Sequence, residues 1–333
     1  MDDTFAAEYH EYEQQLLQLP AQLEYGQTLI PKIEKEKPID KIVFVGMGGS
    51  GFIGDFCQAL CQDLTDIPII VLKDSHAHSY ITENSLVFIL SYSGNTQETI
   101  EVYRRVMQRK AVVFSFSSGG KIEQLSHMYD NTYIKIPSGL QPRQSIGYFL
   151  PSILSILSTY TEIPSFEADL HVTIQSVKKN IFQEYAKDLY EKIQDTTPIM
   201  YGARTFAPLA YVWKTQLQET AKQPAFSHVM PECFHNELMM LDSQTAKEQF
   251  SYLILHDSGQ NDKTLTKKIS SFYSLLKEKK CVCQEIKIRG ENSLSRMISA
   301  YYLGEWFALI CAQKRLQNPL SVKTIEDFKQ KTK

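Results

Sequence analysis

Three hydroxyl side chains crowd a short segment that follows an apolar run. Ser91, Ser93 and Thr96 surround Gly94, directly after residues 86–90 and before a polar segment of helical character. A short apolar run bounded by a turn is typical of a buried parallel strand, and here it leads into a helix. The free N–H groups and positive end of a helix attract anions, and the hydroxyls add hydrogen-bond donors. The segment therefore predicts a phosphate-binding loop, with a simple helix cap as the plainer alternative.

A second loop of small residues precedes this one in the chain. The β-branched run 41–45 leads into GMGGSG at 46–51 and then into a predicted helix over about 52–60. The G-x-G-x-x-G spacing fits a dinucleotide-binding turn, for which Asp74 would supply the ribose-binding carboxylate. The same glycines suit any ligand that must approach the backbone closely, and Ser50 could hydrogen-bond a sugar hydroxyl. The motif alone leaves both interpretations open.

One carboxylate and one imidazole could transfer protons in the second half of the chain. Glu219 lies in the last turn of a predicted helix that ends before Pro224, and His235 follows in a turn that opens another helix. A carboxylate and an imidazole that lie near each other suit general acid and base catalysis. The plainer interpretation is a solvated Glu at the end of a helix.

Arg143 ends a segment that contains Pro and Gly, 137–143, just before a predicted helix over 145–160. An Arg at the start of a helix opposes the helix dipole, which suggests that an anion is its partner. The alternative is a solvated Arg in a Pro-rich loop.

No pattern in the sequence calls for a metal ion. His76 and His78 have no carboxylate nearby that would serve as a third ligand, and a turn after Asp74 explains them better. The cysteines have neither zinc-site nor disulfide-framework spacing; they stand at positions 57, 61, 233, 281, 283 and 311. We therefore predict that the protein has no metal site.

Composition and charge limit the class of protein. The chain has 333 residues, is 43% hydrophobic and carries a net charge of −3, which favours a globular protein of about two domains over a nucleic-acid-binding one. Its N-terminal residues are acidic and lack a signal-peptide pattern, and no apolar run approaches the ~20 residues of a membrane span. We therefore expect a cytoplasmic protein with no nucleic-acid or membrane partner.

Predicted strands and helices alternate along both halves of the chain. Strands are expected at 41–45, 69–72, 86–90, 111–114, 132–136, 199–202, 252–256 and 282–288. This alternation predicts α/β domains, each a doubly wound parallel sheet flanked by helices. One or two helices over 8–35, broken near Pro20, should cover the first sheet. The predicted boundaries are 1–36 for the N-terminal helical segment, 37–163 for the first domain and 164–333 for the second.

Six blocks of the sequence together resemble one family of enzymes. The blocks are GMGGSG at 46–51, SYSGNTQET at 91–99, PSGLQPRQSIGY at 137–148, KTQLQETAKQPAF at 214–226, PECFHNE at 231–237 and NPLSVKTIEDFK at 318–329. They are similar to the bifunctional phosphoglucose/phosphomannose isomerases of the sugar isomerase (SIS) domain superfamily. The resemblance covers nearly the whole chain and implies two flavodoxin-like SIS domains in a homodimer.

The resemblance also implies roles for the first-half residues. The residues that match the phosphate-holding loop are Ser91, Ser93 and Thr96. The residues that match the loop in contact with the sugar are Gly48, Gly49 and Ser50.

Four further residues match catalytic positions of the family. Arg143 matches the residue that stabilises the enediolate, and Glu219 matches the base that moves a proton between C2 and C1. His235 matches a residue implicated in ring opening, which the other subunit supplies in the family. Lys329 matches a C-terminal lysine near the ring oxygen. Asn318 departs from the Asp that is common at its position.

The resemblance thus implies an enzyme that interconverts glucose 6-phosphate, and mannose 6-phosphate as well, with fructose 6-phosphate. Ring opening and an enediol(ate) intermediate need an anion clamp, an acid, a base and a cation, but no cofactor. Such an enzyme would serve glycolysis and gluconeogenesis. One alternative is a non-catalytic sugar-phosphate-binding regulator, which could dispense with Glu219, His235 or Lys329. The other is an NAD-dependent enzyme, which leaves residues 91–96 unexplained.

Overall fold

The computed structural model describes residues 3–33, 38–179, 181–194, 196–259 and 262–331. The chain forms two compact units. The first unit is Gln18–Gln175, and the second unit combines Met1–Leu17 with Ser176–Lys333. The predicted domain boundaries at 36 and 163 stay a prediction.

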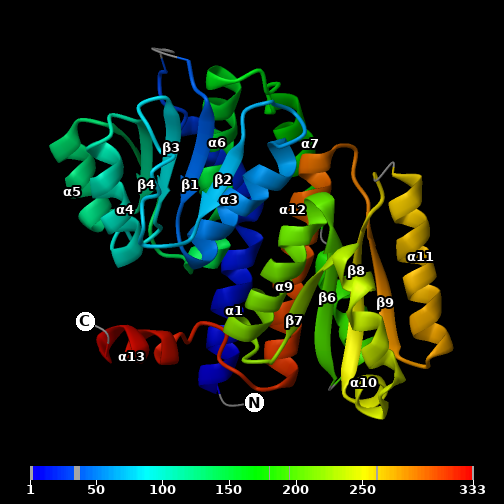
Figure 1. Cartoon of the computed structure of the whole chain (residues 1–333). Coiled ribbons are helices and arrows are strands. Elements are labelled where there is room, and N and C mark those ends of the chain that lie inside the picture. Colours follow the sequence, from blue (N-terminus) through cyan, green and yellow to red (C-terminus); the bar gives the residue numbers. More distant parts are fainter. Residues whose placement is uncertain (1–2, 34–37, 180, 195, 260–261, 332–333) are drawn as a thin grey trace. The chain divides into compact units, whose positions relative to one another are not determined.

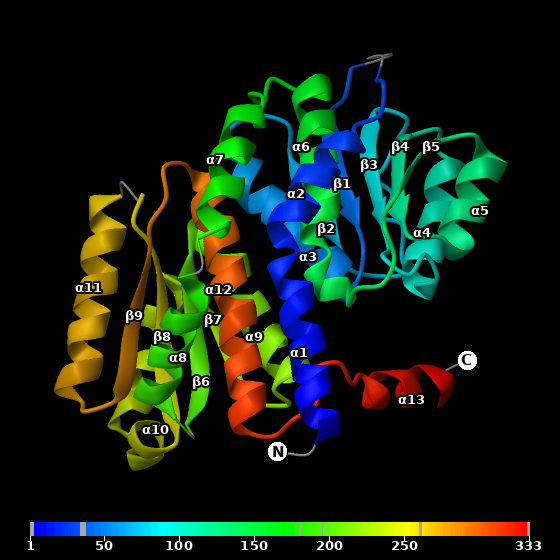
Figure 2. The same ribbon diagram turned by 180° about the vertical axis from the view of Figure 1, so that it is seen from behind.

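The first unit is built on a parallel sheet of five strands in the order β2-β1-β3-β4-β5. The strands are β1 (Lys41–Val45), β2 (Ile69–Leu72), β3 (Ser85–Leu90), β4 (Val112–Ser117) and β5 (Thr132–Lys135). The helical elements are α2 (Leu19–Thr28), α3 (Gly48–Cys61), α4 (Gln97–Met107), α5 (Gly120–Tyr129), η1 (Pro142–Gln144), α6 (Ile146–Tyr160) and α7 (Glu167–Val177), the last of which reaches into the second unit by sequence. Figures 1 and 2 show this sheet from both sides.

Both faces of the first sheet are apolar, as expected for a parallel sheet between two layers of helices. On one face, Val43 and Val87 join a core with residues of α4 and α5. On the other face the Phe44 and Phe88 rings stack at 4.7 Å, and Phe116 stacks on Phe149 of α6 at 5.8 Å. Every residue of β3 is buried, which explains why the run 86–90 was readable as a central strand.

The second unit contains a parallel sheet of four strands in the order β7-β6-β8-β9. The strands are β6 (Thr197–Ala203), β7 (Phe226–Met230), β8 (Phe250–Asp257) and β9 (Val282–Ile288). The helical elements are α1 (Asp3–Leu17), α8 (Phe182–Ile193), η2 (Arg204–Phe206), α9 (Ala207–Thr220), η3 (Glu232–His235), η4 (Glu237–Asp242), α10 (Gln244–Glu248), α11 (Lys263–Glu278), α12 (Ser293–Lys314) and α13 (Lys323–Lys331).

Helix α12 is the packing centre of the second unit. Nearly all of its residues are buried, and α1, α8 and α9 pack against it. A buried polar cluster joins three of these helices: Tyr12 of α1 donates a 2.8 Å hydrogen bond to Glu305 of α12, and Gln216 of α9 donates one of 2.9 Å. Tyr12 also lies 3.0 Å from the hydroxyl of Thr220. Burial of the Glu305 carboxylate is thus matched by hydrogen bonds, as a buried polar group requires.

The structure confirms the fold class, two parallel sheets flanked by helices with helices at the N-terminus. It corrects one expectation about these N-terminal helices. Only α2 packs in the first unit, against α6, whereas α1 packs in the second unit against α12. The break near Pro20 divides the two helices, but a helical pattern does not show which apolar surface each helix will meet.

Strand β7 is an element that the sequence did not predict. Phe226 and Val229 are half exposed, so the strand lacks the continuous apolar run that marked the others. Among the described strands it pairs with β6 alone, as the edge strand of its sheet. Within the described residues, no helix combines the length and the apolar character that crossing a membrane would require.

Candidate functional site

The predicted phosphate loop lies at the carboxyl end of β3 and leads directly into α4. Ser91 is buried, with its hydroxyl 3.0 Å from that of Thr96, while the exposed Ser93 accepts a 3.3 Å hydrogen bond from the N–H of Asn95. Thr96 is the residue before the helix, yet its side chain makes no capping hydrogen bond. The first N–H groups of α4 have no partner within the helix, so an anion at this end would find both donors and a favourable dipole.

Glycines shape this loop by allowing close backbone contacts. Gly94 has φ of +68°, and a Cβ there would lie 1.8 Å from the carbonyl oxygen of Gly119. The side chain of Asn95 also joins these two loops, because its Oδ1 accepts a 3.1 Å hydrogen bond from the N–H of Lys121 at the start of α5. The β3–α4 and β4–α5 loops are therefore held together as one surface.

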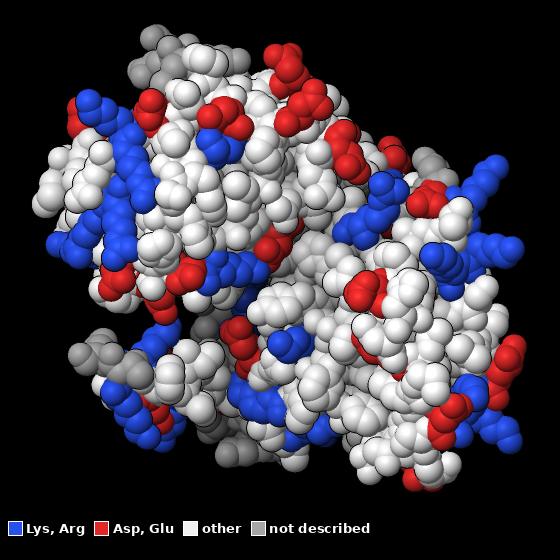
Figure 3. Space-filling view, viewed as in Figure 1, with Lys and Arg blue, Asp and Glu red and all other residues white. Residues whose placement is uncertain are grey.

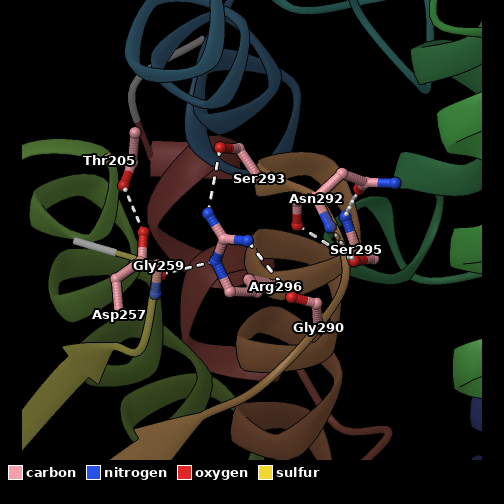
Figure 4. A network of polar contacts seen from close by, with 8 residues as sticks. All are labelled: Thr205, Asp257, Gly259, Gly290, Asn292, Ser293, Ser295 and Arg296. Atoms are coloured by element: carbon pink, nitrogen blue, oxygen red, sulfur yellow. Dashed lines mark hydrogen bonds and ion pairs between the residues drawn. The ribbon is translucent and has the colours of Figure 1, made fainter. Parts of the chain in front are cut away.

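At the corresponding carboxyl ends of the second sheet, two carboxylates bind the nearby hydrogen-bond donors. Strand β8 takes the place of β3 in the strand order, but Asp262 caps the following helix α11 by accepting a 3.0 Å hydrogen bond from the N–H of Leu265. Asp257, at the end of β8, forms a 2.5 Å ion pair with Arg296 of α12 and accepts from the N–H of Gly259 at 2.8 Å (Figure 4). Because these carboxylates already accept hydrogen bonds from the nearby donors, the described part of this loop does not favour a phosphate.

Around this ion pair, the start of α12 is capped by its own side chains. Asn292 accepts a 2.7 Å hydrogen bond from the N–H of Ser295, and Ser295 accepts from the N–H of Asn292 in return. Figure 4 shows this capping box beside Arg296.

Asn292→Ala is expected to lower the free energy of unfolding by about 1 kcal/mol, because it removes a helix-capping acceptor. Chemical denaturation measures the change. Asn236→Ala is the matched control, since Asn236 also precedes a helical segment but makes no capping hydrogen bond with its side chain. Equal losses in both variants would contradict the assigned role of Asn292.

The glycine-rich loop begins its helix earlier than predicted. Helix α3 starts at Gly48 and not at residue 52, because the positive φ of Gly48, +54°, completes the turn within the motif. Gly49 lies against the backbone of Arg143: a Cβ at position 49 would be 2.8 Å from the Arg143 Cα. Ser50 is buried and accepts a 3.1 Å hydrogen bond from the N–H of Tyr92. Ser50 therefore joins the two predicted ligand loops, and its hydrogen bond to a sugar hydroxyl stays a prediction.

Arg143 lies in η1 and is only 7% exposed. A guanidinium buried to this extent needs charged or polar partners, which argues against the alternative of a solvated side chain. Its neighbours in the chain hold the turn, since Gln144 N–H donates to the Gln141 carbonyl at 2.9 Å and the Ser145 hydroxyl donates to that of Pro142 at 2.8 Å.

Asp74, His76 and His78 make contacts with one another and with their neighbours in the chain. Asp74 accepts hydrogen bonds from the N–H groups of Ser75 and His76, which makes it a turn-forming residue. The two His rings contact each other at 5.1 Å between centroids. No group of three His, Cys, Asp or Glu suited to a metal ion occurs among the residues that the structure describes.

The predicted catalytic residues of the second half lie on three elements of the second unit. Glu219 is in the last turn of α9 and is partly exposed, His235 ends η3 and is exposed, and Lys329 is on α13, which has no buried residue. Glu237, close to His235 in the chain, is held by Tyr201 at 3.0 Å and by His228 at 2.5 Å. Burial and this carboxylate raise the pKa of Tyr201 above its usual value.

Lys222 connects two of these elements, a role that was not predicted from the sequence. Its ammonium donates to the carbonyl of Glu219 at 2.6 Å and to that of Ser321, just before α13, at 2.9 Å. Lys222 therefore ties the end of α9 to the segment that carries Lys329. A sequence signal existed, because a Lys beyond the last turn of a helix is well placed to bind its final carbonyls.

Charge on the molecular surface is mixed. Figure 3 shows acidic and basic side chains interspersed on one face.

The family models that match the chain are the SIS domain over residues 37–134 and the bacterial phospho-glucose isomerase C-terminal SIS domain over residues 182–332. The first match covers strands β1 to β4 and most of β5, and the second covers all four strands of the second sheet.

Comparison with known proteins finds sugar-phosphate enzymes. The bifunctional phosphoglucose/phosphomannose isomerase of Aquifex aeolicus is 30% identical over 305 residues, which cover 89% of this chain and 91% of the relative. A D-glucosamine-6-phosphate 4-epimerase of Sulfolobus acidocaldarius is 27% identical, with 70% of this chain and 74% of the relative covered. In structure, a putative phosphosugar isomerase of Clostridium difficile superimposes with a TM-score of 0.74 at 14% identity, covering 96% of this chain and 97% of that one.

Proposed function

Because the chain belongs to the family of bifunctional phosphoglucose/phosphomannose isomerases, we propose that it interconverts glucose 6-phosphate and fructose 6-phosphate, with mannose 6-phosphate as a further substrate. The observation that carries this proposal is the loop 91–96 at the end of β3. It presents hydroxyls at the start of α4, where the Thr96 side chain makes no capping hydrogen bond. At the corresponding position of the second sheet, the carboxylate of Asp262 caps α11. Among the described residues, that difference makes the carboxyl end of β3 better suited to a phosphate monoester than that of β8.

Each predicted residue has a role in this reaction. Ser91, Ser93 and Thr96 bind the phosphate, and the loop with Gly48, Gly49 and Ser50 approaches the sugar. His235 assists ring opening, and Lys329 lies at the ring oxygen.

Proton transfer follows ring opening. Glu219 removes the C2 proton of the aldose, and the C2–H electrons form the C1=C2 bond of an enediolate as the C1 carbonyl becomes an oxyanion. Glu219 then returns the proton to C1 while the O2 proton passes to O1, which gives the ketose. The Arg143 guanidinium stabilises the negative charge that develops on the oxygen of the enediolate. No electron leaves the substrate, so the overall reaction balances without a cofactor.

A coupled assay of the purified protein tests this proposal. We expect turnover of glucose 6-phosphate and mannose 6-phosphate to fructose 6-phosphate, and unchanged activity after treatment with a chelator. Glucosamine 6-phosphate belongs in the same assay because of the related epimerase. Tight binding of a hexose 6-phosphate without any turnover would instead support a non-catalytic regulator.

We also propose a cytoplasmic homodimer in which His235 acts on the site of the other subunit. The exposure of His235 and of Met239, Phe226 and Val229 nearby in the chain supports a surface available to a second copy. Mixing inactive His235→Ala with inactive Glu219→Gln is expected to restore activity, because one of the two sites in each heterodimer would keep both residues. No recovery after verified subunit exchange would contradict shared sites.

A further inference from the structure

Tyr92 connects four loops of the first unit, although it lies between two of the predicted phosphate-binding serines. Its N–H donates to the Ser50 hydroxyl in the glycine-rich loop at 3.1 Å. Its carbonyl accepts from the N–H of Ser118 at 2.9 Å and from the Ser118 hydroxyl at 2.7 Å, in the β4–α5 loop. Both backbone groups therefore fix the phosphate loop against its neighbours.

The phenol of Tyr92 serves a different segment. It donates to the carbonyl of Pro137 at 3.0 Å and accepts from the N–H of Leu140 at 3.0 Å. Both partners belong to the segment 137–143, which leads to Arg143. Burial raises the pKa of the phenol, against a lowering contribution from the Leu140 hydrogen bond, so the phenol stays protonated and able to donate.

Arg143 is thus located by contacts on two sides. From one side, its backbone lies directly on Gly49, where a Cβ would be 2.8 Å away. From the other, the Tyr92 phenol closes the turn that begins at Pro137 and contains Gly139, whose φ is +105°. Glycine leaves a backbone free to adopt several conformations, so the hydrogen bonds of the phenol select one of them.

We propose that Tyr92 is a positioning residue whose phenol, through Pro137 and Leu140, holds Arg143 in register with the phosphate loop. The proposal rests on the proposed function for the role of Arg143 and extends it to a residue to which no role in binding phosphate or sugar is assigned. Because one residue joins the phosphate loop to the Arg segment, the distance from the bound phosphate to the guanidinium is set within a single unit.

Tyr92→Phe removes only the hydroxyl and keeps the ring and both backbone links. We expect kcat to fall about 10- to 100-fold, as for a small displacement of a catalytic group, while KM and the Kd of inorganic phosphate change less than about threefold. Tyr103→Phe is the matched control. Tyr103 is also buried, and its hydroxyl is hydrogen-bonded to Asn131, just before β5. Its hydroxyl therefore lies at the amino ends of the strands, away from the predicted ligand loops.

A double-mutant cycle separates positioning from a general loss of stability. In an Arg143→Lys background, Tyr92→Phe should lower kcat far less than in the wild type, because both changes disturb the same group. An aldonate 5-phosphate, whose carboxylate resembles the enediolate, should bind Tyr92→Phe about tenfold more weakly, whereas inorganic phosphate should not.

These outcomes distinguish the two proposals. The wild type could lack turnover and still bind the aldonate 5-phosphate more tightly than Tyr92→Phe does. That result would contradict the isomerase proposal and support the role of Tyr92. Equal binding of this compound by wild type and Tyr92→Phe, or fully additive effects with Arg143→Lys, would overturn the role of Tyr92. Weakened phosphate binding together with unchanged kcat would overturn it as well.

Discussion

Glu219→Gln is expected to lower kcat by at least ~10²-fold while sugar-phosphate binding is largely retained. The substitution keeps the shape of the side chain and removes the group that would accept the carbon-bound proton. The structure gives a reason to expect little disturbance elsewhere. Helix α9 is anchored by Gln216 and Thr220, which contact the buried cluster of Tyr12 and Glu305, and none of these side chains changes in the variant.

Steady-state kinetics and calorimetry with fructose 6-phosphate measure the two effects of this substitution. Glu232→Gln is the matched control, because Glu232 is an exposed carboxylate in η3, close to His235 in the chain. We expect it to leave turnover near normal. Normal turnover in Glu219→Gln together with a large loss in Glu232→Gln would assign the base to Glu232. Glu237 is a weaker candidate because Tyr201 and His228 already bind its carboxylate.

A double substitution in the phosphate loop, Ser93→Ala with Thr96→Ala, is expected to weaken phosphate binding by roughly two to four powers of ten. Each hydrogen bond to a charged oxygen contributes about 1.5–3 kcal/mol, and two donors would be lost. The fold should persist, since strand β3 is fully buried and neither hydroxyl supports its core. Ser91 would also lose the Thr96 hydroxyl that lies 3.0 Å away, which adds to the effect.

Calorimetry with inorganic phosphate and with fructose 6-phosphate measures this loss. Ser155→Ala with Thr159→Ala is the control, because it removes the same two hydroxyl types from α6 of the same unit. An NAD titration of the wild type completes the experiment. Unchanged phosphate affinity in the loop variant, together with measurable NAD binding, would favour the dinucleotide interpretation of residues 46–51 over the isomerase.

The sequence predicted those parts of the fold that depend on local apolar patterns. Strands such as 41–45 and 69–72 were predicted at their observed bounds, because their residues are apolar nearly throughout. Strand β7 was missed because its edge position leaves Phe226 and Val229 half exposed. The packing of α1 was mispredicted because the partner of an amphipathic helix is a tertiary property, and α12 lies nearly 300 residues further along the chain.

The candidate site was predictable in its loops but not in its connections. Hydroxyls and glycines after strands are a local signal, so 46–51 and 91–96 could be proposed from the sequence. The hydrogen bonds of Tyr92 join positions separated by 26 to 48 residues, and that of Lys222 with Ser321 spans 99. A buried Tyr hydroxyl must find a partner, but its sequence does not reveal which one.

The assignment of α1 to the second unit has a consequence for how the protein is made. Because the ribosome produces the chain from its N-terminus, α1 emerges before the first unit, whereas its partner α12 emerges after it. The first unit can fold as soon as residue 175 has left the exit tunnel, while α1 still has Tyr12 and Leu16 without their native neighbours. In topological terms the first unit is an insertion in the second. Co-translational folding should therefore begin with the first unit, before α1 and α12 meet, and a chain truncated before α12 should leave α1 open to chaperones and proteases.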